Sequence, residues 1–132
     1  MKMLSIDEFL DKNKVAAMGG VALAFVGDAV HSLYVRKTLV LEKDYKTGDL
    51  NKLSSEIVCA KAQSDFVEKL MSVLTEDELA VFKRARNAKK GTRAKHASVT
   101  DYNNATGFEA VLGYLYLSGD RERLDFLLNY GG

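Results

Sequence analysis

No proline occurs among the 132 residues of this chain, where average usage would give about six. Proline interrupts helices, and the apolar positions recur at three- and four-residue spacing without a convincing two-residue alternation. The pattern therefore predicts an all-α fold. The length suffices for one domain with its own core and is too short for two ordinary domains, so we expect residues 1–132 to form a single domain.

Capping residues and apolar periodicity place the expected helices. The pairs Ser5–Glu8 and Thr75–Glu78 each form a capping box, which typically begins a helix. The expected helices are a short one from Ser5, a long one over about 19–41, one from 47–49 that continues through 70, one from Thr75, one over about 101–117 and one from Asp120 to near Asn129. We expect residues 87–98 to form a loop.

Composition excludes several classes of protein. The longest stretch without a charged or polar residue, 16–27, has twelve residues, whereas a membrane span needs about 20. Acidic residues at Asp7 and Glu8 are unlike a secretory signal peptide. The single cysteine, Cys59, cannot form an internal disulfide, and its apolar neighbours indicate a small core residue. We therefore expect a protein of the reducing cytoplasm that has no membrane partner.

Positive charge is concentrated in one segment, although the formal net charge is only +1. No acidic residue lies between Glu78 and Asp101, and seven of the 19 cations do, which leaves 12 cations against 18 acids elsewhere. A charge run is often only a solvated face, but this concentration also favours a polyanion site. The lack of aromatic residues before Tyr102 favours contact with a duplex backbone over base stacking. The candidate phosphate-contacting residues are Arg84, Arg86, Asn87, Lys89, Lys90, Thr92, Arg93, Lys95 and His96.

Two acidic residues, Asp28 and Glu109, interrupt the two most apolar expected helices. An ionised carboxylate in apolar surroundings is costly unless it is paired or binds a metal. The two helices could approach closely through small residues, which are Ala24, Gly27, Ala105 and Gly113. The two acids could then meet at a divalent cation. The alternative, that each acid pairs with Arg or His or caps a neighbouring helix, stays open, and His31 is expected on the surface of its helix.

Several segments resemble a known family. Residues 25–30, FVGDAV, resemble the F-L-G-D-A-V core of the ribonuclease III signature, and residues 108–110, FEA, resemble that family's second acidic motif. The chain is most similar to Mini-ribonuclease III, the form without a double-stranded RNA-binding domain. The matching segments are GDAVHSLYVR at 27–36, AKAQ at 60–63 and the whole of 83–124. The resemblance covers about residues 18–128.

The resemblance implies an all-helical ribonuclease III endonuclease-like domain that works as a homodimer. It implies Mg²⁺-dependent cleavage of double-stranded RNA to 5′-phosphate and 3′-hydroxyl ends. The implied task is to process the ends of the 23S ribosomal RNA precursor during maturation of the large ribosomal subunit. Asp28 and Glu109 match the family's metal-binding catalytic acids, and the candidate phosphate contacts become candidate RNA-binding residues. Ala24 and Thr106 stand where full-length ribonuclease III has further acids, so waters and RNA phosphates would have to complete the metal shell.

A second hypothesis is a non-catalytic ribonuclease III-like module that binds structured RNA. A module that only binds RNA has no need for acids that face a polyanion, so the presence of Asp28 and Glu109 favours the enzyme. A helical protein-interaction domain would leave the basic segment unexplained. A large-subunit ribosomal protein is kept as a candidate partner.

Overall fold

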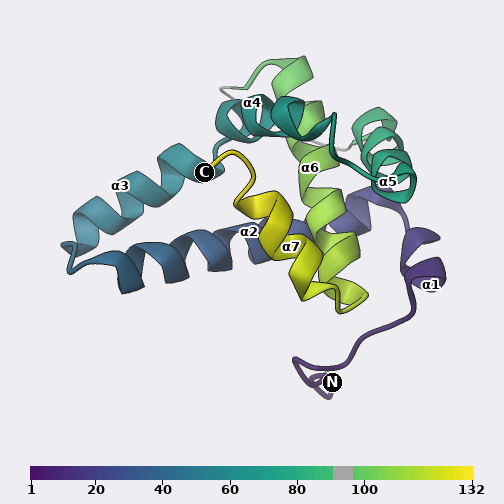
Figure 1. The fold of residues 1–132 in the computed structure, drawn as a ribbon, viewed down its shortest axis with the longest axis horizontal. Helices are drawn as coiled ribbons and strands as arrows, with labels where there is room; N and C mark the ends of the chain where they lie inside the picture. The colour runs from purple at the N-terminus through teal and green to yellow at the C-terminus, as the bar shows by residue number, and fades with distance from the viewer. Residues whose placement is uncertain (91–96) are drawn as a thin grey trace.

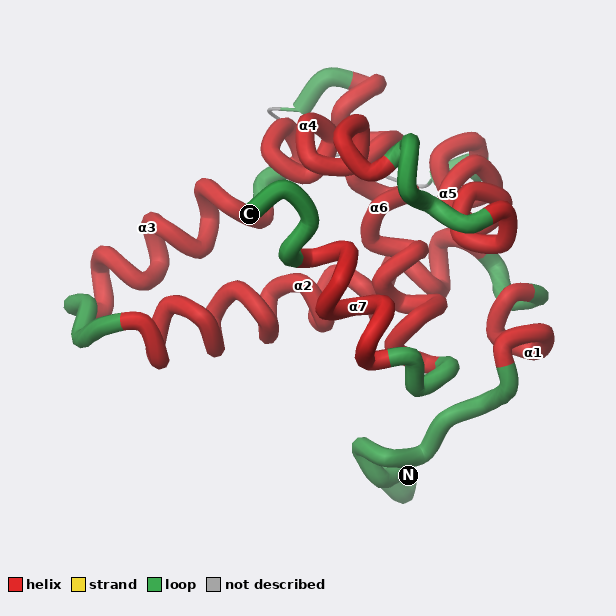
Figure 2. Tube along the Cα trace, in the orientation of Figure 1, coloured by secondary structure: helices red, strands yellow, loops and turns green. Residues whose placement is uncertain are grey.

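A computed structural model of the chain describes residues 1–90 and 97–132. These residues form α-helices and no strand, which confirms the all-α prediction (Figure 2). The helices are α1 (Lys12–Ala16), α2 (Gly20–Glu42), α3 (Thr47–Val58), α4 (Ala60–Leu70), α5 (Glu76–Asn87), α6 (Val99–Leu117) and α7 (Arg121–Leu128). Helix α6 runs through the middle of the molecule and contacts α1, α2, α4, α5 and α7 (Figure 1).

Helices α2 and α6 pack against each other where both carry glycine. A Cβ atom at Gly27 would overlap the backbone carbonyl of Glu109, and a Cβ atom at Gly113 would overlap the carbonyl of Leu23. The close approach that the small residues predicted is thus confirmed at these two positions. It places the backbone of Glu109 directly beside the residue that precedes Asp28.

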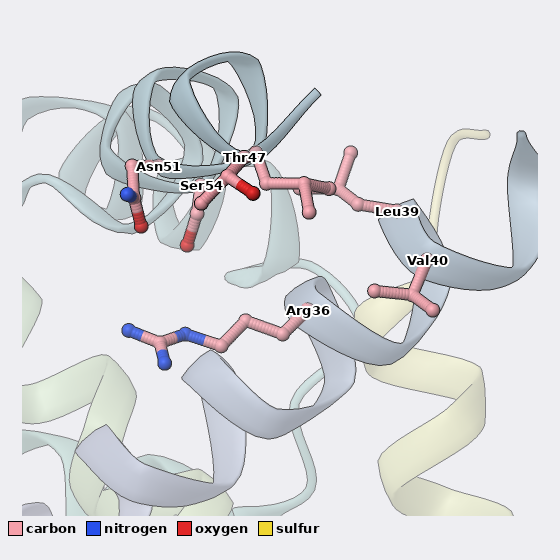
Figure 3. A pocket seen from close by; sticks show the side chains of 7 residues that line it. Arg36, Leu39, Val40, Thr47, Asn51 and Ser54 are labelled. Carbon is pink, nitrogen blue, oxygen red and sulfur yellow. The ribbon is translucent and has the colours of Figure 1, made fainter. Parts of the chain in front are cut away.

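The main hydrophobic core surrounds α6. Its largest buried side chains are Phe82, Phe108, Leu23, Leu70, Leu112, Leu115, Leu124 and Leu127. Helix α3 contributes no residue to this core. Helix α3 instead extends from the body together with the C-terminal half of α2, and the two form a hairpin (Figure 1). The hairpin encloses a hollow of about 160 Å³, into which Arg36, Asn51 and Ser54 project (Figure 3).

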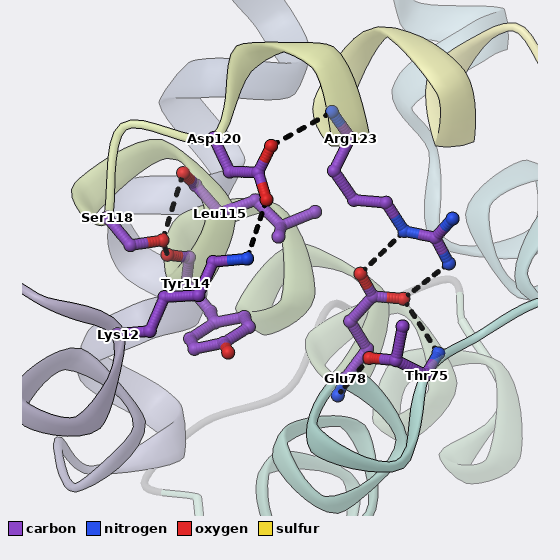
Figure 4. A network of polar contacts seen from close by, with 8 residues as sticks. All are labelled: Lys12, Thr75, Glu78, Tyr114, Leu115, Ser118, Asp120 and Arg123. Atoms are coloured by element: carbon purple, nitrogen blue, oxygen red, sulfur yellow. Dashed lines mark hydrogen bonds and ion pairs between the residues drawn. The ribbon is translucent and has the colours of Figure 1, made fainter.

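A buried ion pair joins α7 to α5. Glu78 is 2% exposed, and its carboxylate accepts hydrogen bonds from Arg123 Nε at 2.7 Å and Nη2 at 2.8 Å (Figure 4). The same carboxylate accepts the backbone N–H of Thr75, whose hydroxyl accepts the N–H of Glu78 in return. The capping box predicted at this position is therefore confirmed. Lys12 and Asp120 form a second link at 2.6 Å, which ties α1 to the start of α7.

The expected helix at Ser5 is wrong. Ser5 and Glu8 take part only in a turn, and the first helix is α1, whose N-cap is Asp11. This N-terminal segment is almost entirely exposed, so a helix there would gain little from burial. Helix α7 begins at its predicted cap, Asp120, and Ser98 caps α6, which starts two residues earlier than expected.

The helix expected to run unbroken to residue 70 is in fact two helices. Cys59 has extended backbone geometry, with φ −66° and ψ 157°, and it ends α3 and begins α4. No proline or glycine marks this break. It turns α4 onto α6, where Val67 and Leu70 enter the core. The prediction that Cys59 is a core residue is also wrong, because the residue is exposed at this corner.

In the described ranges, every helix is too short or too polar to cross a membrane.

Candidate active site

One pocket contains both of the singled-out acids. It has a volume of about 400 Å³ and lies between α2, α6 and the segment that follows α5. Its lining residues are Val21, Ala24, Phe25, Asp28, Lys90, Tyr102, Thr106 and Glu109. The structure therefore brings Asp28 and Glu109 together, as their positions on two closely packed helices suggested. Ala24 and Thr106 line the same pocket as Asp28 and Glu109. These are the two positions at which full-length members of the family that the sequence resembles have further acids.

The two carboxyl groups affect each other strongly. Asp28 is exposed, whereas Glu109 is half-buried. Burial raises the pKa of Glu109 to about 8, and a hydrogen bond and charge repulsion from Asp28 add to this shift. A carboxyl with this pKa holds a proton at neutral pH unless a positive charge enters the site. The protonation of Glu109 therefore depends on the charge of Asp28.

A buried glutamine on α4 also reaches Glu109. Gln63 is 3% exposed, and its Nε2 lies 3.3 Å from Glu109 Oε2 and 2.9 Å from His31 Nδ1. The hydrogen bond from Gln63 lowers the pKa of Glu109 and opposes part of the effect of burial. Gln63 was not predicted as a site residue, because its polarity alone does not distinguish it from a surface residue. The one sequence signal that includes it is the AKAQ segment, which resembles the family.

The expectation that His31 lies on the helix surface is wrong. The residue is 6% exposed, and its ring meets the ring of Phe108 edge-on at 5.2 Å. Burial lowers the pKa of His31 to about 4, against a smaller opposite effect of Asp28. The imidazole is therefore neutral at pH 7. Its hydrogen-bond partner is Gln63 rather than Asp28.

Among the described residues of the basic segment, Lys90 lines the pocket. Its ammonium group donates hydrogen bonds of 2.9 Å to the carbonyls of Arg86 and Ala88 at the end of α5. Burial lowers the pKa of Lys90. These bonds hold the ammonium group at the pocket that Asp28 and Glu109 also line.

The other described members of the basic segment differ in their contacts. Arg84 donates to the carbonyl of Met18 at 2.6 Å, so its guanidinium also links α5 to the start of α2. Arg86 stacks over Phe82 and donates to Asn87 Oδ1. Lys89 is exposed and forms no ion pair with the described residues. Four candidate contacts, Thr92, Arg93, Lys95 and His96, lie outside the described residues.

The donor set fits a hard divalent cation. Mg²⁺ prefers oxygen ligands and keeps several waters when few carboxylates are available. Asp28 and Glu109 would supply the oxygens. Burial, and to a smaller extent Asp28, raises the pKa of Glu109, and a cation would favour its ionised form. In the ranges that the structure covers, no group of three or more His, Cys, Asp or Glu side chains could hold a metal ion. Two protein carboxylates are thus what this pocket offers.

Comparison with known proteins gives a consistent result. A ribonuclease III domain model matches residues 21–120. A protein named Mini-ribonuclease 3 from Thermoanaerobacter sp. (strain X514) is 43% identical over 128 residues, which cover 97% of this chain and 90% of the relative. Another Mini-ribonuclease 3, from Brevibacillus brevis, is 49% identical over 104 residues, or 79% of this chain and 78% of the relative.

A solved structure agrees with the sequence comparisons. An X-ray crystal structure of a protein from Fusobacterium nucleatum matches with a TM-score of 0.78 and 35% identity, and the match covers 86% of this chain and 90% of that one. Both acids of the pocket fall inside the matched domain. The chain therefore belongs to the ribonuclease III family of endoribonucleases and, within it, to the Mini-ribonuclease 3 group.

Proposed function

We propose that this chain cleaves double-stranded RNA with Mg²⁺ held by Asp28 and Glu109, and that its substrate is the paired end of the 23S ribosomal RNA precursor. The observation that carries the catalytic proposal is the shared pocket, in which two carboxylates on different helices face each other with Lys90 at the rim. The ribosomal RNA assignment rests on the resemblance to Mini-ribonuclease III. From the length and the single cysteine we further propose that residues 1–132 form one catalytic domain and that the protein works in the reducing cytoplasm.

The roles of the residues follow from charge and burial. When bound, Mg²⁺ would activate a water molecule and neutralise charge at the scissile phosphate, to give 5′-phosphate and 3′-hydroxyl ends. Glu109 must lose its proton before it holds a cation, because only the carboxylate is a good ligand. Lys90 would attract the RNA phosphate next to the acids. The other cations of the basic segment would supply affinity along the duplex.

The test is a cleavage assay with a duplex taken from the end stem of the 23S precursor. We expect discrete cuts on both strands with Mg²⁺ and none with excess chelator. Asp28→Asn should keep the fold, measured by circular dichroism, and lose cleavage. Binding of the duplex without cleavage under every divalent ion tested would contradict the catalytic proposal and leave a module that only binds RNA.

A homodimer is part of the proposal. Phe25 and Leu33 on α2 are 83% and 59% exposed, and they line an apolar groove of about 420 Å³ that reaches Asp28. Large exposed apolar side chains in one groove mark a surface that another protein covers. A second copy of the chain on this face would place two pockets along one duplex, one for each strand. A large-subunit ribosomal protein is a further proposed partner, which resemblance alone suggests.

A further inference from the structure

Gln63 connects the core of the molecule to one of the two acids in the pocket. It lies on α4, His31 lies on α2, and Glu109 lies on α6, so three helices meet at one amide group. We propose that Gln63, held in turn by His31, is a positioning residue that fixes the orientation of the Glu109 carboxylate for metal binding and cleavage. This inference rests on the proposed catalytic role of Glu109.

The hydrogen-bonding groups determine how the amide must be oriented. An ionised Glu109 only accepts hydrogen bonds, so the nitrogen of Gln63, and not its oxygen, has to face Oε2. The same nitrogen lies 2.9 Å from His31 Nδ1 and donates its second hydrogen there. This requires a lone pair on Nδ1. His31 is therefore the neutral tautomer that carries its proton on Nε2.

His31 is itself rigidly held. Its ring packs edge-on against Phe108, and Phe66 packs edge-on against the same phenyl ring at 5.7 Å. His31 and Gln63 are 6% and 3% exposed, so water competes little for their hydrogen bonds. The orientation of the amide is thus set by buried groups from three helices rather than by solvent.

The arrangement matters because the pocket has few ligands. Ala24 and Thr106 line it without adding carboxylates, and the Thr106 hydroxyl donates to the backbone carbonyl of Tyr102. With two carboxylates available, a misoriented Glu109 would remove half of the protein's ligands. Partners that orient metal-binding side chains typically change affinity or activity by about 10- to 100-fold when they are removed.

The first test compares two variants on α4. Gln63→Met keeps the length of the side chain and removes its donor. Ser64→Ala is the matched control, because Ser64 is 1% exposed and its described hydrogen bond comes from Asn104 rather than from Glu109. We expect Gln63→Met to lower kcat on duplex RNA by about 10- to 100-fold, with KM nearly unchanged. Ser64→Ala should lower the Tm about as much as Gln63→Met does, but it should keep the wild-type kcat.

A second readout does not depend on cleavage. Binding of Mn²⁺ to the protein without RNA, followed by electron paramagnetic resonance, should be about 10-fold weaker in Gln63→Met and unchanged in Ser64→Ala. Wild-type kcat and Mn²⁺ affinity in Gln63→Met would overturn the inference. If Asp28→Asn and Glu109→Gln also cleaved normally, the proposed catalytic pair would be wrong as well, so the two failures are distinguishable.

A third measurement needs no variant at Gln63 and so covers the case in which that variant does not fold. Nitrogen-15 NMR of the wild-type protein at pH 9, above the pKa of Glu109, reports the tautomer of each imidazole. The chain has two histidines, and a His96→Ala variant assigns the signals. We expect His31 to be neutral with its proton on Nε2. A proton on Nδ1 would exclude the hydrogen bond from Gln63 and overturn the inference.

Discussion

At the scale of single residues, the burial of Glu109 beside Asp28 couples stability to pH. The pKa of Glu109 is about 8 in the folded chain, against 4.5 as its ordinary value. Between these two values the folded state holds a proton that the unfolded state has released. The free energy of unfolding therefore falls as the pH rises from about 4.5 towards 8. A cation bound between the two carboxylates would offset this fall.

Glu109→Gln should separate stability from activity. The amide cannot ionise, so we expect the variant to be more stable than the wild type at pH 8 by about 1–2 kcal/mol, and to gain less at pH 5. Cleavage should be abolished. Urea unfolding at the two pH values measures the difference, with Glu68→Gln on the exposed side of α4 as the control. An equal stability change at both pH values would show that Glu109 does not titrate in this range.

At the scale of helices, the crossing of α2 and α6 has no room for a side chain at Gly27. An added Cβ atom would overlap backbone atoms of Glu109, and backbone moves only if the helices separate. We expect Gly27→Ala to destabilise the fold by about 2–4 kcal/mol and to abolish cleavage, since Asp28 and Glu109 would move apart.

Gly48 offers a control for this change. It is also helical, but nothing lies within 4 Å of a Cβ atom built there. Gly48→Ala should therefore stabilise the protein by about 0.5–1 kcal/mol through helix propensity. Thermal unfolding of both variants measures these effects. Equal Tm values for the two variants would contradict the close packing at Gly27.

The ion pair between α5 and α7 gives a second prediction at this scale. Arg123→Ala would leave the buried Glu78 carboxylate without its main partner, which typically costs about 3–5 kcal/mol. Arg121→Ala removes an exposed pair with Asp7 at 3.4 Å and should change stability by at most about 0.5 kcal/mol. Urea unfolding compares them, and a small effect of Arg123→Ala would mean that water or another donor replaces the guanidinium.

At the scale of the whole molecule, the exposed apolar groove on α2 predicts association. Leu33→Glu puts a charge into this groove at a position outside the pocket of Asp28 and Glu109. We expect the wild type to sediment as a dimer and this variant as a monomer. The rate of cleavage should fall in this variant, because it no longer forms the dimer. Val99→Glu, an exposed apolar position at the start of α6, should remain a dimer in analytical ultracentrifugation. A dimeric Leu33→Glu variant would move the interface to another face.

The basic segment gives a prediction about the electrostatic attraction between the protein and RNA. Lys89→Ala combined with Lys90→Ala should weaken binding to duplex RNA. The slope of log K against log salt should fall in magnitude by about 0.7–0.9 for each phosphate that the protein no longer neutralises. Lys37→Ala, an exposed cation on the hairpin, is the control. Fluorescence anisotropy over a salt series measures the slope, and an unchanged slope in the double variant would remove these lysines from the interface.

Features that depend on neighbours along the chain could be predicted from the amino-acid sequence. The absence of proline, the capping box at Thr75 and the cap at Asp120 specified helices, because caps and periodicity act within one or two turns. The acids were also found, since a carboxylate inside an apolar helix stands out locally. The tertiary structure decided the rest. The break at Cys59, the burial of His31 and the hydrogen bond from Gln63 to Glu109 depend on residues up to 46 positions apart. Such contacts arise from how helices pack, which no local pattern encodes.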